Sequence, residues 1–240
     1  MQEKFIHNEK MHQVGGKYLG DLVYGANDGI VTTFAVISGA AGAGLSSGIV
    51  VILGLANLLG DGISMGLSNF LSLRSERDFH RMERSREYME IEKFPHEERE
   101  EVRVALRKWG ITEEHIPVMV ESITRDKKRW VDFMMVEELG IVEDRIDSPL
   151  THGFMTFAAF LIAGILPLIP YLFGVEEDLQ FLVSFMATAL ALFAVGAARS
   201  LVIKMPWFRA GLEMLMVGGL ATGAAYMMGG IVKALWGIVI

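Results

Sequence analysis

Acidic side chains recur in pairs in the middle of this sequence. The stretch "REYMEIEKFPHEEREEV" (86–102) holds Glu87 and Glu90 before a proline, and Glu98 and Glu101 after it. Side chains three positions apart lie on one face of a helix, so each pair can present two carboxylates together. Packed carboxylates repel one another unless cations neutralise them. If the chain turns back at the proline, the two pairs can face each other around a positive ion.

A second segment, "DFMMVEELG" (132–140), places Glu138 within one helical turn of Met134 and Met135. Oxygen ligands suit hard divalent ions, and thioether sulfur shifts the preference toward softer first-row metals. Together the two segments indicate a site for a divalent transition metal. The alternative is a solvated helical hairpin whose methionines belong to its core, because acid-rich helix faces are common and a Glu-x-x-Glu spacing alone is a weak signal.

Polar residues also interrupt two strongly apolar stretches. Asp28 lies in "YGANDGIVTTF" and Asp61 in "LANLLGDGISMG", where Asn57 and Met65 each stand four positions from Asp61. A charge inside a bilayer costs about 2.5–3.5 kcal/mol on insertion scales, so such residues usually face a cavity or a partner. Asp28, Asn57, Asp61 and Met65 are therefore candidates for an ion pathway, although Asp28 could instead be hydrated at the membrane interface.

The composition indicates the elements that must position these groups. The chain has 240 residues, 52% of them hydrophobic, and a mean hydropathy of +0.37, which is typical of a membrane protein. Apolar runs of about 20 residues, enough to cross ~30 Å of hydrocarbon as helices, lie at 22–43, 48–73, 154–175, 179–198 and 210–232. We expect an all-α membrane protein with five transmembrane helices and a helical insert between the second and third. The expected domains are 1–73, 74–147 and 148–240.

The insert carries its own helix signals. Residues 74–93 continue the second helix without a breaker, so that helix is predicted to run on beyond the membrane. A further helix is predicted from Pro95 to Trp109, with Gly110 as its C-cap. Thr112 marks the predicted start of another, and 127–139 form the last.

Charge and composition set the orientation and exclude several classes. Lys and Arg crowd the N-terminal arm, the insert and the 199–209 connection, which places the N-terminus and the insert in the cytoplasm. The chain contains no cysteine, which excludes disulfides and thiolate metal sites. It has no basic patch for nucleic acid and no secretory signal. Because the N-terminus carries no organelle-targeting arm, we expect a prokaryotic cell membrane.

Four longer segments resemble the vacuolar iron transporter family, and the resemblance covers nearly the whole chain. They are "GANDGIVTTFAVISG", "DGISMGLSNFLSLRSE", "DFMMVEELG" and "LPLIPYLF". Members of that family are known as proton-coupled exporters of ferrous iron from the cytosol, working as dimers with a pore at the subunit interface. The resemblance implies the same fold, with ferrous iron or another divalent metal such as manganese as substrate, protons as counter-ion, a homodimer, no organic cofactor and no enzymatic activity.

The resemblance also implies roles for particular residues. Seven would form the cytoplasmic metal site: Glu87, Glu90, Glu98, Glu101, Met134, Met135 and Glu138. Asp28 and Met65 would lie on the ion path. Family members carry a glutamate where this chain has Asn57, and Asp61, one turn on, can supply the carboxylate. The competing interpretation is a membrane-anchored protein that buffers or senses metal without transport; a di-iron oxidase is disfavoured because Glu-x-x-His pairs are lacking.

Overall fold

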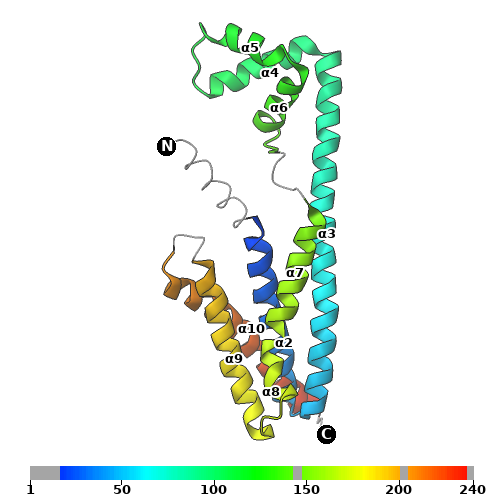
Figure 1. Ribbon diagram of the computed structural model, residues 1–240, viewed down its shortest axis with the longest axis vertical. Helices are drawn as coiled ribbons and strands as arrows, with labels where there is room; N and C mark the ends of the chain where they lie inside the picture. Colours follow the sequence, from blue (N-terminus) through cyan, green and yellow to red (C-terminus); the bar gives the residue numbers. More distant parts are fainter. Residues whose placement is uncertain (1–16, 143–147, 201–204, 237–240) are drawn as a thin grey trace, which may run out of the picture. The chain divides into compact units, whose positions relative to one another are not determined.

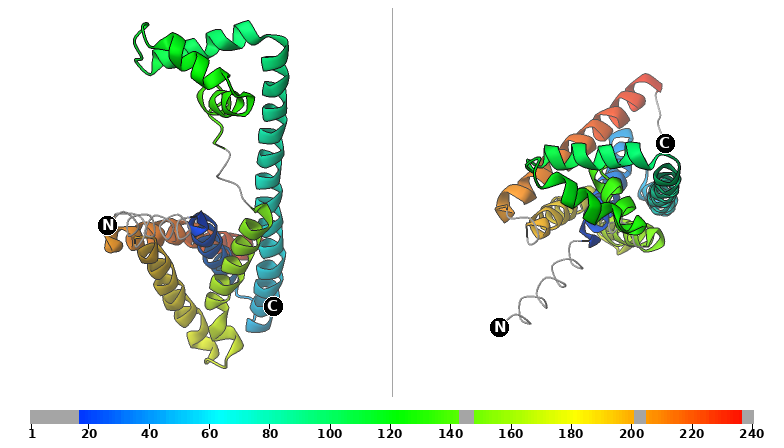
Figure 2. Two further views of the ribbon diagram at one scale, coloured as in Figure 1. Left: turned by 45° about the horizontal axis from the view of Figure 1, so that its top comes forward. Right: turned by 90° about the horizontal axis from the view of Figure 1, so that it is seen from above.

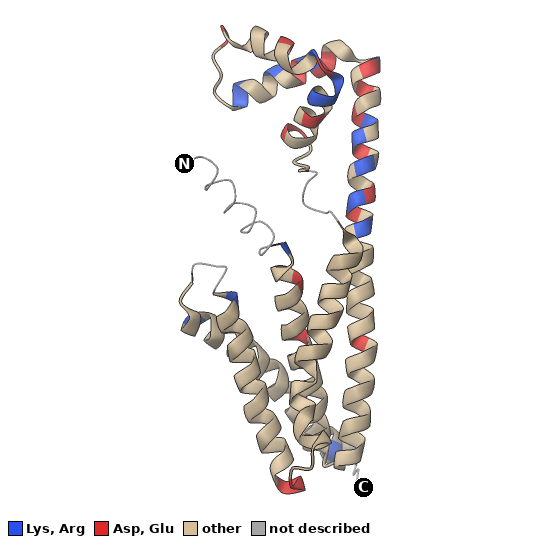
Figure 3. Ribbon diagram, viewed as in Figure 1, with Lys and Arg blue, Asp and Glu red and all other residues tan. Residues whose placement is uncertain are grey.

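The structure, a computed structural model, describes residues 17–142, 148–200 and 205–236, and within these ranges it contains helices and connections but no strand. The expected all-α class is confirmed. The chain divides into two compact units. We call Met1–Phe70 with Leu150–Ile240 the apolar unit, and Leu71–Pro149 the charged unit. Figure 1 shows the helices, and Figure 3 shows Lys, Arg, Asp and Glu gathered on the charged unit.

Long helices build the apolar unit. They are α2 (Leu19–Ala43), the first part of α3 (Ser47–Lys93), α7 (Pro149–Gly164), α9 (Glu177–Arg199) and α10 (Trp207–Trp236), with the short η2 (Leu166–Leu168) and α8 (Ile169–Leu172) after α7. Helix α10 packs against α2 and α9, and α2 also packs against α9 (Figure 2). The helix bounds lie within a few residues of the apolar runs, since length and hydropathy largely determine them.

Four stretches of the described chain are long and apolar enough to cross a membrane: Ser47–Lys93, Pro149–Leu172, Glu177–Arg199 and Trp207–Leu235. Helix α2 has 25 residues, but Asn27 and Asp28 lower its hydropathy. Four of the expected spans therefore have a matching helix, and the span through α2 stays a prediction.

Glycines set two close helix approaches in this unit. A Cβ at Gly29 of α2 would collide with the backbone oxygen of Phe160 in α7, and a Cβ at Gly229 of α10 would collide with the backbone oxygen of Gly39 in α2. Only glycine permits backbones this close, and such contacts are how helices associate where lipid removes the hydrophobic driving force. Helix α2 is thus held between α7 and α10.

The charged unit contains the second part of α3, then α4 (Pro95–Lys108), α5 (Ile116–Thr124) and α6 (Lys127–Glu137). The predicted continuation of the second helix through 74–93 is confirmed by the unbroken α3. Pro95 opens α4, and Gly110, with φ of 80°, follows its end, as predicted.

The helix predicted to start at Thr112 instead starts at Ile116. The preceding residues form a turn, in which the His115 amide donates to the Thr112 carbonyl at 2.9 Å and Thr112 Oγ1 lies 2.7 Å from His115 Nδ1. Pro117 then occupies the first helical turn, where its missing N–H costs nothing. The local hydrogen bonds of Thr112 and the proline together move the helix start.

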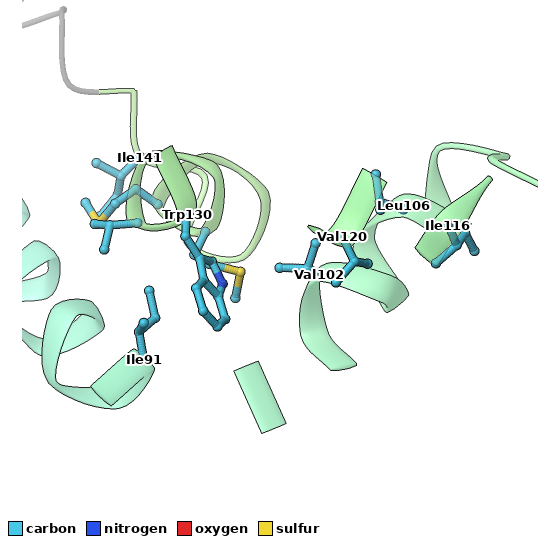
Figure 4. Packing of buried hydrophobic residues seen from close by; sticks show 10 residues of the cluster. Ile91, Val102, Leu106, Ile116, Val120, Trp130 and Ile141 are labelled. Carbon is cyan, nitrogen blue, oxygen red and sulfur yellow. The ribbon is translucent and has the colours of Figure 1, made fainter. Parts of the chain in front are cut away.

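A hydrophobic core of its own holds the charged unit together (Figure 4). Its buried members come from all four helices and the segment after α6: Ile91, Val102, Leu106, Ile116, Val120, Trp130, Val131, Met134, Met135 and Ile141. Burying one such aliphatic side chain stabilises a fold by about 1.5–3 kcal/mol. This core fixes the acid-bearing faces of α3, α4 and α6 within one unit.

Candidate metal centre and ion path

Two glutamates from different helices meet in the interior of the charged unit. Glu87 of α3 is 3% exposed and Glu98 of α4 is 6% exposed, and a side-chain hydrogen bond joins them. Burial raises the pKa of Glu87 to about 8, and the negative charge of Glu98 adds to the rise. Burial, with the charge of Glu101, raises the pKa of Glu98 to about 7. The pair therefore retains a proton near neutral pH when no cation is present.

Glu138, the C-cap residue of α6, extends this pair into a cluster. Loss of solvation raises the pKa of its carboxyl, and the charges of Glu101 and Glu90 raise it further. A side-chain hydrogen bond joins Glu138 to Glu101. We call Glu87, Glu90, Glu98, Glu101 and Glu138 the carboxylate cluster. All five predicted acidic ligands are thus close enough for their charges to interact.

The two predicted methionine ligands have different surroundings. Met134 and Met135 are 1% and 2% exposed, and both belong to the hydrophobic core. Met134 also lines a pocket of about 180 Å³, whose walls include Glu101 and Glu138. Met135 is not among the residues that line this pocket. The structure therefore brings one thioether to the carboxylate cluster and packs the other as a core residue.

Two carboxylate oxygens of the cluster lack a partner in the described structure. One oxygen of each carboxyl, Glu87 Oε1 and Glu98 Oε2, is buried without a hydrogen-bond partner among the described residues. Leaving such an oxygen unsatisfied is costly, and a hydrogen-bond donor or a cation would remove that cost. Among the described residues no three His, Asp or Glu groups are already positioned around one ion. Metal binding therefore requires the shared protons to leave and the carboxylates to converge.

Glu137 also lies at this site, and the sequence pattern did not predict it. Glu137 lines the same pocket, and its Oε2 accepts a hydrogen bond from Trp109 Nε1 at 2.8 Å. The sequence predicts Glu138 because it lies one helical turn from Met134 and Met135, and that spacing does not point to Glu137. Because Glu138 is the C-cap of α6, both neighbours reach the pocket. The adjacent "EE" at the predicted helix end was the available signal.

The apolar unit brings together the predicted ion-path residues of α2 and α3. Asp28 and Asp61 are both half-buried, and they are close enough for their charges to interact. The Thr32 hydroxyl donates to the Asp28 backbone carbonyl at 2.7 Å, which leaves the Asp28 carboxylate free of that contact. Met65 is half-buried and packs on an apolar cluster that includes Phe34 and Phe160.

Unsatisfied amide groups accompany these two carboxylates. Asn57 Nδ2 and Asn27 Oδ1 are buried without a hydrogen-bond partner among the described residues. In hydrocarbon such groups are costly, so they usually face a water-filled cavity or a substrate path. The arrangement of carboxylates and amides can bind a cation, a proton or water.

The chain is similar to known proteins over nearly its whole length. The sequence profile of the VIT family matches residues 19–230. A vacuolar iron transporter of Toxoplasma gondii is 35% identical over 96% of this chain and 80% of its own length. Vacuolar iron transporter 1 of Arabidopsis thaliana is 31% identical over 95% of this chain and 91% of its own length. The corresponding protein of Plasmodium falciparum is 33% identical, covering 95% and 89%.

Proposed function

The chain belongs to the VIT family, and from this we propose that it transports iron, exporting the ferrous ion from the cytosol in exchange for protons. The relatives are named for iron transport. The observation that carries the finer proposal is the carboxylate cluster, in which Glu87 Oε1 and Glu98 Oε2 are buried without a hydrogen-bond partner among the described residues. The transport direction, the proton coupling and manganese as a second substrate are parts of the proposal.

Capture of the ion is the first step. The carboxylate cluster supplies hard oxygen ligands, and Met134 supplies a softer sulfur from the wall of the pocket that Glu101 and Glu138 also line. Such a mixed set suits Fe²⁺ and Mn²⁺ better than Mg²⁺ or Ca²⁺, which prefer oxygen alone. Met135 would need to leave its core position to join, so we place it behind the site.

Passage through the membrane is the second step. Asp28 and Asp61 on adjacent helices can hold either protons or a cation, and that alternative occupancy is what exchange requires. Asp61 supplies the carboxylate that family members have at the position of Asn57. Asn57 and Met65 are neutral ligands on the same helix. Binding a metal there releases protons, and reprotonation releases the metal.

The proposed topology follows the positively charged connections. Lys and Arg in the charged unit and the N-terminal arm support a proposed topology with both in the cytosol and five spans including α2. A homodimer is proposed from the family resemblance. The relatives are named for the vacuole and come from eukaryotes, so they give the expected prokaryotic cell membrane no support.

A metal buffer is the second candidate, and one observation favours it. The carboxylate cluster and the core that supports it lie within the charged unit alone. A protein that only stores or senses metal needs nothing more than such a unit and an anchor. It does not need Asp28 and Asp61 within hydrocarbon, where carboxylates destabilise the fold.

Proteoliposomes containing the full chain separate these candidates. A metal-sensitive dye measures the flux of ferrous iron or manganese with and without a proton gradient. Transport coupled to protons predicts flux that follows the gradient and is lost in Asp28→Asn, while Asp178→Asn, an exposed acid at the start of α9, behaves as wild type. Metal binding without flux would support the buffer. Flux that ignores the gradient would exclude exchange for protons.

A further inference from the structure

A second polar network lies inside the apolar unit, away from Asp28 and Asp61. His152 Nδ1 of α7 is 2.5 Å from Asp21 Oδ2 of α2, and the two side chains are 9% and 13% exposed. Asn69 Nδ2 of α3 donates to Asp21 Oδ1 at 2.8 Å and to Thr156 Oγ1 at 2.7 Å. Thr156, which is fully buried, donates to the backbone carbonyl of His152 at 3.1 Å. One network thus joins three helices.

Close backbone contacts surround this network. A Cβ at Gly25 of α2 would collide with the backbone oxygen of Thr156, and a Cβ at Gly153 of α7 would collide with that of Gly66 in α3. The three helices therefore hold Asp21 and His152 at short range with little room for water. In such a low-dielectric setting the charges of an ion pair act much more strongly on one another than in water.

The network also lies at a distinctive place in the chain. Asn69 is one residue before the boundary at Phe70, and His152 is two residues after the other boundary at Leu150. These are the two points at which the chain passes between the apolar and charged units. The network therefore includes residues close in sequence to both points where the chain leads into and out of the charged unit.

The hydrogen bond to Asp21 determines which nitrogen of His152 exchanges a proton. With Asp21 Oδ2 as acceptor, Nδ1 keeps its hydrogen in the neutral ring, so the proton gained on ionisation is carried by Nε2. Asp21 faces the ring and, before α2, so does the Tyr18 phenol, whose ring centroid is 4.8 Å away. Lys17 Nζ lies 5.9 Å from the Tyr18 ring, and α3 contributes the uncharged Asn69 amide.

We infer that His152 is a proton-binding site of the transport cycle, with Asp21 as the residue that positions and stabilises its protonated form. The inference rests on the proposed function, since it assigns one of the exchanged protons to a named side chain. A purely structural tie between three helices requires only uncharged hydrogen-bonding groups such as Asn69 and Thr156. Histidine adds a charge that changes near neutral pH, which a metal–proton exchanger can use.

The test measures ferrous iron flux in proteoliposomes of the full chain between about pH 5.5 and 7.5, the range in which histidine changes charge. Wild type should show a pH-dependent flux, bounded at about tenfold per pH unit for one titrating site. His152→Gln should reduce the slope of this profile and leave the part that the carboxylate cluster contributes near and above about pH 7. The matched control is His115→Gln, an exposed histidine of the charged unit, which should keep the wild-type profile.

Asp21→Asn gives a second, independent readout, because it removes the charge and keeps one of the two accepting oxygens. Without the carboxylate, protonated His152 loses its stabilising partner, so the midpoint of the profile should differ from that of wild type. A structural role would lower flux at every pH and leave the midpoint unchanged. That outcome, or a wild-type profile in His152→Gln, overturns the inference.

Failure of the inference and failure of the proposed function give different results. If wild type carries no metal, or carries it without regard to the gradient, the proposed function fails. If wild type exchanges metal for protons and both variants keep its pH profile, only the assignment to His152 fails. Should His152→Gln not fold in detergent, as judged by gel filtration, the midpoint of Asp21→Asn decides.

Discussion

Glu87 and Glu98 join α3 to α4 through a hydrogen bond between two buried carboxyl groups. Burial raises the pKa of both groups, to about 8 and about 7, so this contact depends on a retained proton. A divalent metal that binds these oxygens must displace that proton. Proton and metal are therefore competitors at the same atoms.

Metal affinity should rise steeply with pH. Below about pH 7 Glu87 and Glu98 hold protons and oppose binding, and above about pH 8 both are ionised and favour it. Isothermal titration of the full chain in detergent with Mn²⁺, which resists oxidation in air, measures the dissociation constant at pH 6 to 8.5. An affinity that is independent of pH would contradict the competition.

Replacing one buried ligand should weaken metal binding without unfolding the charged unit. Glu98→Gln keeps the side-chain volume but removes the charge, so affinity should fall by more than about tenfold, a loss that even an outer-shell residue can cause. The control is Glu114→Gln, in the exposed turn before α5. Equal binding by the two variants, measured by the same titration, would remove Glu98 from the site.

The metal-free charged unit should lose stability as pH rises. In the folded state Glu87 and Glu98 bind protons up to about pH 8 and 7, whereas the ordinary value for glutamate is 4.5. The folded form therefore holds more protons between these values, and its stability, fully present below about pH 4.5, declines as pH increases through about 7 to 8. Denaturant unfolding followed by the fluorescence of buried Trp130 measures this decline.

One variant and one added ligand test the cause of that decline in stability. Glu87→Gln should reduce the slope, because its neutral amide has no proton to lose, and saturating Mn²⁺ should reverse the slope by stabilising the ionised form. Stability that increases from pH 6 to 8.5 without metal would show that the carboxyls are not protonated in the folded protein.

Replacement by alanine should affect the stability of the fold differently at two glycines of α10, Gly229 and Gly219. Gly229→Ala places a Cβ against the backbone oxygen of Gly39 in α2 and should destabilise the fold by at least about 1–3 kcal/mol, as overpacking does. Gly219 has no described atom within 4 Å of such a Cβ, so Gly219→Ala should be neutral or stabilising by up to about 1 kcal/mol. Thermal unfolding in detergent compares them, and equal melting temperatures would exclude the close α2–α10 contact.

The sequence predicted most of the helices because their signals are local. The unbroken α3 follows from the absence of a proline or glycine stop between 74 and 93, and α4 from Pro95 and Gly110. The predicted start of α5 at Thr112 was wrong, because Thr112 forms hydrogen bonds in a turn with His115. Local propensity did not indicate which of the two conformations the chain would adopt there.

The candidate site was predictable where spacing determines it and not where packing does. Four acids of the carboxylate cluster lie in the two i, i+3 pairs on either side of the proline, and Glu138 lies one turn after Met134 and Met135. The family resemblance then assigned all five to a metal site. Which methionine reaches the pocket depends on the rotation of α6 against the core, which no spacing rule gives. Asp21 and His152 are 131 positions apart, and their contact depends on the packing of α2 against α7.

Met134 has two neighbours of opposite character, since it packs in the core of the charged unit and also lines the pocket with Glu101 and Glu138. On the proposed function, the Met134 side chain therefore both selects among metals and stabilises the fold. Leucine there would preserve the volume and erase the sulfur, leaving an all-oxygen site open to calcium. One conservative substitution at this position would therefore change which metals the proposed site binds while the fold keeps its stability.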